Sequence, residues 1–153
     1  YVTRRAVERG VDAHWRTARA SALLHDLAKT YTIRYGGNHS QLGAAWAMEL
    51  TGNPLLCMGI VHHVYWPFDL DAAAQLVPLS VIYGDKRVTH DHIVGLDQRF
   101  DDLIERYGAT ETIRARILVT HEQAVDIENQ LSELIQEDLH ACAFDCGRLV
   151  HGA

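Results

Sequence analysis

Residues 21–29 of this chain read Ser21-Ala22-Leu23-Leu24-His25-Asp26-Leu27-Ala28-Lys29. Apolar residues recur at helical spacing through this stretch and back to residue 13, so the pattern predicts one helix over residues 13–29 with Asp12 as its N-cap. Two strongly polar side chains, His25 and Asp26, follow the apolar stripe. Burial of such groups is unfavourable unless they are paired or bound to metal. The stretch therefore predicts a core helix that also carries a site for chemistry.

Helical spacing continues outward from this segment. Residues 31–38, with Gly36-Gly37, are expected to form a loop. Four further helices are predicted at residues 39–50, 54–64, 72–88 and 97–107. Asn53 caps the third helix of the chain, Pro78 is a candidate kink in the fourth, and no strand-like alternation is found. The expected fold class is all-α, a compact helical bundle.

The last predicted helix is much longer than the others. Between residues 110 and 139, apolar side chains recur at alternating spacings of three and four, at Ile113, Ile117, Ala124, Ile127, Leu131 and Leu134. Thirty residues rise about 45 Å, more than a small domain needs to cover one face. The stripe is therefore expected either to join two copies in a homodimer or to fold back along its own bundle. We divide the chain into a core at 1–108, this helix at 109–139 and a tail at 140–153.

Composition limits the function classes. The net charge of −6 argues against a protein that binds nucleic acid through its backbone charge. No apolar run reaches the roughly 18 to 20 residues that cross a bilayer. Neither a nucleic-acid partner nor a membrane partner is therefore expected. The three cysteines cannot all pair in disulfides, and a cytoplasmic location is expected for this reason. A small phosphorylated substrate remains allowed if metal ions supply positive charge locally.

Further histidines and a carboxylate follow His25-Asp26 in a regular order. His39 opens the second predicted helix, His62-His63 lie near the end of the third, and Asp85 lies on the fourth. Bundles build metal sites from side chains near the ends of facing helices. Imidazole nitrogens mixed with carboxylate oxygens suit iron, manganese, zinc or magnesium. The residues do not decide whether His62 or His63 is the ligand.

This ordered series resembles the HD superfamily of metal-dependent phosphohydrolases. The resemblance is to the bacterial branch with a His-Asp-Ile-Gly-Lys core motif, which reads His25-Asp26-Leu27-Ala28-Lys29 here, and it covers residues 1–107 approximately. Other stretches are similar to that family as well: Gly43-Ala44, Ile60 before the histidine pair, the run from Asp85 to Asp91, and Leu96-Asp97-Gln98-Arg99-Phe100.

The resemblance implies an HD-domain-like bundle that hydrolyses a phosphate ester or anhydride, with a nucleotide as the expected substrate. Two divalent cations would be held by His25, Asp26, His39, His63 (or His62) and Asp85, and would activate a hydroxide for attack on phosphorus. With only one metal, His39 and His63 would contact the phosphate instead. Lys29 shares a helical face with Asp26 and is a candidate phosphate contact, as is Lys86; a cation at a helix end is the alternative reading for Lys29.

The resemblance has one departure. The family pattern begins with a histidine on the helix before the His-Asp motif, and residues 1–9 contain none. His14 cannot take this place, because it is too close to His25 in the sequence and falls on the same predicted helix. Three helical turns would separate the two side chains by about 16 Å. We expect the missing ligand to lie before Tyr1. The alternative is a catalytically weak or inactive nucleotide-sensing module of the same fold.

Other chemistry-bearing residues form weaker patterns. His140, Cys142, Cys146 and His151 are irregularly spaced for a zinc site, and a tail without a catalytic role is favoured. His90, His92 and His121 lie outside the ordered series and are expected to be surface or loop residues.

Overall fold

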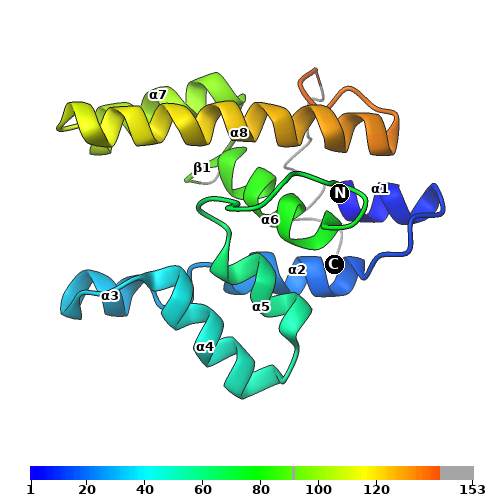
Figure 1. Ribbon diagram of the computed structural model, residues 1–153, viewed down its shortest axis with the longest axis horizontal. Helices are drawn as coiled ribbons and strands as arrows, with labels where there is room; N and C mark the ends of the chain where they lie inside the picture. Colours follow the sequence, from blue (N-terminus) through cyan, green and yellow to red (C-terminus); the bar gives the residue numbers. More distant parts are fainter. Residues whose placement is uncertain (91, 142–153) are drawn as a thin grey trace. The chain divides into compact units, whose positions relative to one another are not determined.

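The computed structural model describes residues 1–90 and 92–141 and confirms an all-α chain with a long C-terminal helix (Figure 1). It divides into two compact units, Tyr1–Asp85 and Lys86–Ala153, which are described separately. The division falls after Asp85, whereas the sequence predicts one core over residues 1–108. None of the helices in the described ranges combines the length and the apolar character needed to span a membrane.

The first unit is built of short helices. Its elements are α1 (Val2–Glu8), α2 (Trp15–Leu24), α3 (Lys29–Tyr35), α4 (His39–Thr51), α5 (Pro54–Val61) and α6 (Leu76–Lys86), which runs to the unit's end. Helix α5 packs against both α2 and α4, while α3 packs against α4 and α1 against α2. A core cluster joins α4 and α5 through Ala44, Ala47, Leu56, Cys57 and Ile60.

The predicted boundaries between α4 and α5 are confirmed by their hydrogen bonds. The Asn38 side chain accepts from the backbone N–H groups of Ser40 and Gln41 at the start of α4. Gly52 ends that helix in a left-handed conformation with φ of 61°, which glycine adopts at little cost. The Asn53 side chain then caps α5, with Pro54 at its first position.

The single helix predicted over residues 13–29 is wrong. Helix α2 ends at Leu24, the chain turns over residues 25–28, and α3 follows where a loop was expected. Asp12 is not the N-cap, a position that His14 occupies without a side-chain hydrogen bond. The turn keeps backbone bonds three residues apart, from Leu27 N–H to Leu24 and from Lys29 N–H to Asp26. The spacing of apolar residues in the sequence therefore stays helical across the turn and does not reveal it.

Smaller differences have local causes. Helix α5 ends at Val61 and not near residue 64, and α6 begins at Leu76 and not at 72. Pro78 lies in the first turn of α6, where its missing N–H would have no helical partner, so no kink is required. The hairpin of β1 (Val88–Thr89) and β2 (His92–Ile93) was not predicted, because two-residue strands are too short to show alternation.

The second unit contains this hairpin, α7 (Leu96–Tyr107) and α8 (Glu111–Ile135), and α7 packs along α8. A buried ion pair ties the segment after α6 to α8: Arg87 Nη1 donates to Glu128 Oε1 at 3.1 Å and to the carbonyl of Leu139 at 2.9 Å. The predicted apolar stripe of α8 is buried only in its second half, at Ala124, Ile127 and Leu131, while Ile113 stays 38% exposed. The homodimer therefore stays a prediction.

The crossing of α2 and α5 gives the first testable prediction. A Cβ on Gly59 would lie 2.2 Å from Ser21 Oγ, the buried hydroxyl that donates to the Leu56 carbonyl at 2.8 Å. Gly59→Ala should therefore force the helices apart or break this bond, lowering the free energy of unfolding by about 1–3 kcal/mol. Thermal or urea unfolding followed by circular dichroism measures the change.

Gly84→Ala is the matched control for that measurement. Gly84 lies inside α6 with no atom within 4 Å of the added Cβ, so alanine should be neutral or stabilising by about 0.5–1 kcal/mol. Equal losses of stability in the two variants would contradict the close approach at Gly59.

Candidate metal centre

Five polar side chains of the first unit converge from four segments. His25 is the C-cap of α2, Asp26 follows it in the turn, His39 is the first residue of α4, His63 lies just after α5, and Asp85 lies in the last turn of α6. Each comes from the end of a helix, as the sequence analysis expected. The turn after α2 solves a geometric problem, because His25 and Asp26 would point about 100° apart on a continuous helix.

The nitrogen and oxygen atoms of this cluster approach one another closely. Asp26 Oδ1 lies 3.4 Å from His39 Nε2 and 3.6 Å from His63 Nε2, and Asp26 Oδ2 lies 3.6 Å from His25 Nε2. His39 Nε2 and His63 Nε2 are 3.1 Å apart, and Asp85 Oδ1 is 3.5 Å from His25 Nε2. Three of these residues, His25, Asp26 and His63, offer ligand atoms that all lie within 4.8 Å of one another.

These separations match the spacing of atoms around a bound cation. Imidazole and carboxylate ligands lie about 2.0–2.2 Å from a metal ion, so two ligands at 90–110° are separated by about 3.0–3.5 Å. The closest pairs in the cluster fall in or just above that range. Direct hydrogen bonds would instead bring a ring nitrogen and a carboxylate oxygen to about 2.7–2.9 Å.

The fit to a cation is tested by the atom at the centre of the cluster. Asp26 Oδ1 is buried and has no hydrogen-bond partner among the described residues. A buried carboxylate oxygen without a partner is costly. A metal ion would satisfy it, and the mixed nitrogen and oxygen donors suit a divalent cation such as iron, manganese or zinc.

Two of the histidines are oriented by the same backbone device. His25 Nδ1 lies 2.6 Å from the carbonyl of Ala22, and His63 Nδ1 lies 2.7 Å from the carbonyl of Ile60. Each carbonyl lies three residues earlier, at a helix end where backbone acceptors lack helical partners. Because a carbonyl only accepts, Nδ1 carries the proton and Nε2 presents its lone pair to the cluster in the neutral ring.

The environment changes the pKa values of these rings in opposite directions. The carboxylate of Asp85, with Oδ1 3.5 Å from Nε2, raises the pKa of His25, against an opposing effect of burial. Burial lowers the pKa of His39 and lowers that of His63 to about 4. His63 is therefore a neutral imidazole at neutral pH, the form that binds metal.

The structure places the two histidines of the pair in different surroundings. His63 lies in the cluster and is 2% exposed. The His62 ring instead makes edge contacts with Trp66 and Phe68, at centroid distances of 5.2 and 5.4 Å. The geometry thus brings His63, and not His62, to the other candidate ligands. The sequence left this choice open because both residues follow the same helix.

The two candidate phosphate-binding lysines also differ. Lys29 begins α3, and its ammonium lies 2.6 Å from Asp26 Oδ2 with half of the side chain exposed. It is thus at the edge of the cluster and open to solvent. Lys86 follows Asp85 directly, but it is buried and belongs to the second unit, and its role stays a prediction.

The remaining histidines of the described ranges lie outside the cluster. His14 is the N-cap of α2, and His90 contacts Arg106. The His121 ring stacks on Phe100 with centroids 4.5 Å apart, and its Nε2 lies 3.1 Å from Asp97. His121 therefore has a structural contact in the second unit that the sequence did not indicate. Cys142, Cys146 and His151 lie outside the described residues.

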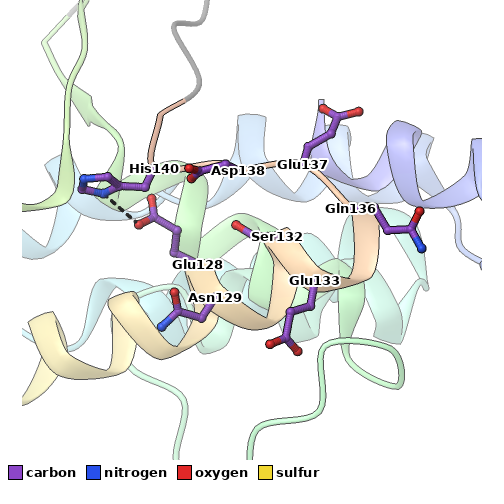
Figure 2. A pocket seen from close by; sticks show the side chains of 8 residues that line it. All are labelled: Glu128, Asn129, Ser132, Glu133, Gln136, Glu137, Asp138 and His140. Atoms are coloured by element: carbon purple, nitrogen blue, oxygen red, sulfur yellow. Dashed lines mark ion pairs between the residues drawn. The ribbon is translucent and has the colours of Figure 1, made fainter.

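A separate hollow of about 500 Å³ lies at the end of α8 in the second unit (Figure 2). Its lining is polar and acidic, made of Glu128, Asn129, Ser132, Glu133, Gln136, Glu137, Asp138 and His140. The buried acid among them, Glu128, is already engaged by Arg87 and lies 3.4 Å from His140 Nδ1. None of the described residues that line this hollow offers a metal ion a buried oxygen without a hydrogen-bond partner, as Asp26 does.

Comparison with known proteins adds no assignment. No family model, curated protein or solved structure matches the chain. The function must be argued from the cluster itself.

The neighbouring histidines give a direct test of the centre. His63→Ala should weaken binding of Mn²⁺ by on the order of tenfold or more, because it removes a buried neutral ligand, while His62→Ala should leave it within about twofold. Isothermal titration of the metal-stripped protein with Mn²⁺ measures both affinities. A larger loss in the His62 variant would place the ligands elsewhere.

Proposed function

We propose that this chain is a metal-dependent phosphohydrolase that cleaves a phosphate ester or anhydride bond of a nucleotide-type substrate. The observation that carries the proposal is the buried, unpartnered oxygen of Asp26 facing the Nε2 atoms of His39 and His63. Such a site binds a cation, and its similarity to the ordered motif of the HD superfamily supports phosphate chemistry in particular.

Each side chain of the centre has a role in this proposal. His25, Asp26, His63 and Asp85 would hold the metal, with His39 as a further ligand or as a contact to the phosphate. When bound, the metal supplies two things, a lowered pKa for water and positive charge beside the phosphoryl oxygens. The Nδ1 bonds of His25 and His63 keep both rings in the orientation and tautomer that ligation needs.

Lys29 is the chain's own cation at the centre. Its ammonium contacts Asp26, and half of the side chain is exposed. A phosphate that enters from solvent can therefore bind the ammonium without burying the lysine charge unpaired. Charge developing on the phosphoryl group would then be stabilised from the side of α3. Such electrostatic stabilisation is commonly the largest contribution of residues in phosphoryl transfer.

Asp26→Ala tests the centre through turnover. The variant should lose the hydrolysis of p-nitrophenyl phosphate and nucleotides, by at least 100-fold, because the shared carboxylate is removed. His90→Ala, outside the cluster, should leave turnover and metal content unchanged. Full activity in the Asp26 variant would refute the proposal, and metal binding without turnover in the unmodified protein would favour a nucleotide-sensing module instead.

Lys29→Ala separates substrate contact from metal binding. The variant should reduce kcat/KM by roughly 10- to 100-fold, the loss expected for one charge-assisted hydrogen bond, while metal content stays the same. Arg34→Ala removes a cation from the same short helix and should change neither quantity. Parallel steady-state kinetics and elemental analysis measure the two effects, and equal loss of metal and activity would make Lys29 structural.

A further inference from the structure

The positive charges of the first unit are confined to its N-terminal third. Every arginine and lysine of residues 1–85 lies before residue 35: Arg4, Arg5, Arg9, Arg16, Arg19, Lys29 and Arg34. Residues 35–85 contain none, and their acidic residues are Glu49, Asp69, Asp71 and Asp85. The whole-chain net charge of −6 therefore hides a basic segment made of α1, α2 and α3.

Part of this segment is organised around one indole ring. The guanidinium of Arg4, on α1, lies 4.9 Å from the ring centroid of Trp15, and that of Arg16, on α2, lies 5.2 Å from it. Stacking on an aromatic ring holds a guanidinium in place while its N–H edge stays available. Two cations from different helices are thus brought together against their mutual repulsion.

Arg19 extends the same surface along α2. It lies one helical turn after Arg16 and, like Arg4 and Arg16, is exposed. None of the three has a carboxylate partner in the part of the chain that the structure describes. By contrast, Arg99 and Arg106 of the second unit pair with Asp102. We refer to Arg4, Arg16 and Arg19 as the arginine surface.

Two residues of the arginine surface, Arg16 and Arg19, lie in the first half of α2, and the metal centre lies at the other end of this helix. Helix α2 begins at Trp15 and ends at Leu24, next to His25 (Figure 1). At 1.5 Å per residue, Trp15 and His25 are about 15 Å apart along the axis, and Arg19 is about 9 Å from His25. A ligand that places one phosphate at the metal centre and another at Arg16 must carry phosphates about this far apart, as the backbone of a polynucleotide does.

We propose that the arginine surface binds the backbone of a single-stranded nucleic acid whose reacting phosphate lies at the metal centre. The inference rests on the proposed phosphohydrolase function and narrows its substrate class to a polynucleotide. The Asp26 side chain is only one-third exposed, so the reacting phosphate must leave the protein surface to reach the metal centre. A flexible single strand is favoured because a rigid duplex that runs along α2 cannot bend one of its phosphates into the centre.

Equilibrium binding tests this without turnover. The full chain, with metal chelated, is titrated into fluorescein-labelled single strands of about 12 nucleotides, RNA and DNA, and anisotropy is followed from low to moderate salt. Arg16→Ala/Arg19→Ala should weaken binding on the order of tenfold and reduce the salt slope by about 0.7 for each arginine removed. Arg16→Lys/Arg19→Lys should keep most of the slope.

Arg116→Ala is the matched control. Arg116 is an exposed arginine of α8 in the second unit, so Arg116→Ala removes one positive charge, as Arg16→Ala alone does, and should leave affinity within about twofold. Circular dichroism of each variant checks that the fold is kept. An equal effect of Arg116→Ala and the double variant would overturn the proposal, because it would reduce the effect to net charge.

The outcomes separate this inference from the proposed function. Strand binding that depends on Arg16 and Arg19, without any hydrolysis, would leave the surface standing and refute the phosphohydrolase. Hydrolysis of p-nitrophenyl phosphate without strand binding would overturn the surface alone. Tighter binding to anionic phospholipid vesicles than to strands, or self-association that is lost in the double variant, would assign the arginines to a membrane or to a second copy and also overturn it.

Discussion

The carboxylate of Asp26 is the group on which the arrangement of the first unit depends. Oδ1 is buried without a hydrogen bond. Oδ2 contacts the Lys29 ammonium and lies 3.6 Å from His25 Nε2. Three imidazoles face it with nitrogen atoms, two of them with lone pairs fixed by backbone bonds. Packing alone does not favour such a group, since an apolar side chain would fill the space at lower cost. A bound cation, as proposed above, would supply the missing partner.

Helix ends, and not helix faces, supply the ligands. His25 and His63 each follow the last turn of a helix, and Nδ1 of each ring donates to the carbonyl three residues earlier, which fixes the direction of the ring. His39 occupies the first position of α4, where the cap provided by Asn38 fixes the direction of the helix. Helix α4 packs closely here, since a Cβ on Gly43 would lie in ordinary contact with Ile60 and Ala28, at 3.5–3.7 Å. Short helices with well-defined ends are thus the means by which this sequence gathers a polar site.

Sequence reasoning succeeded where hydrogen bonding is local. The predicted helix starts at residues 39 and 54 and the predicted ends at residues 50 and 107 depend on caps and glycines that involve only neighbouring residues, and the structure has each of them within one residue. It failed at residues 25–28, because a turn that retains short-range backbone bonds preserves helical spacing while it reorients the chain. The choice between His62 and His63 depends on packing against α2 and on the aromatic contacts of Trp66 and Phe68, which no spacing rule contains. The activity itself stays a prediction.

Net charge was the least informative of the sequence arguments, because electrostatic recognition depends on where charges lie. In the first unit the arginines and lysines all lie before residue 35, whereas the acids are spread along the chain: Glu8, Asp12 and Asp26 before that residue, and Glu49, Asp69, Asp71 and Asp85 after it. Within about a Debye length of 8–10 Å, a phosphate at the surface of α2 interacts with Arg16 and Arg19 more strongly than with charges that lie farther away. Lys29 lies where the two groups meet, as the cation bound directly to Asp26. A metal ion beside Asp26 would add positive charge next to Lys29, so that attraction of a phosphate chain and neutralisation of its reacting group would become successive effects of one charge distribution.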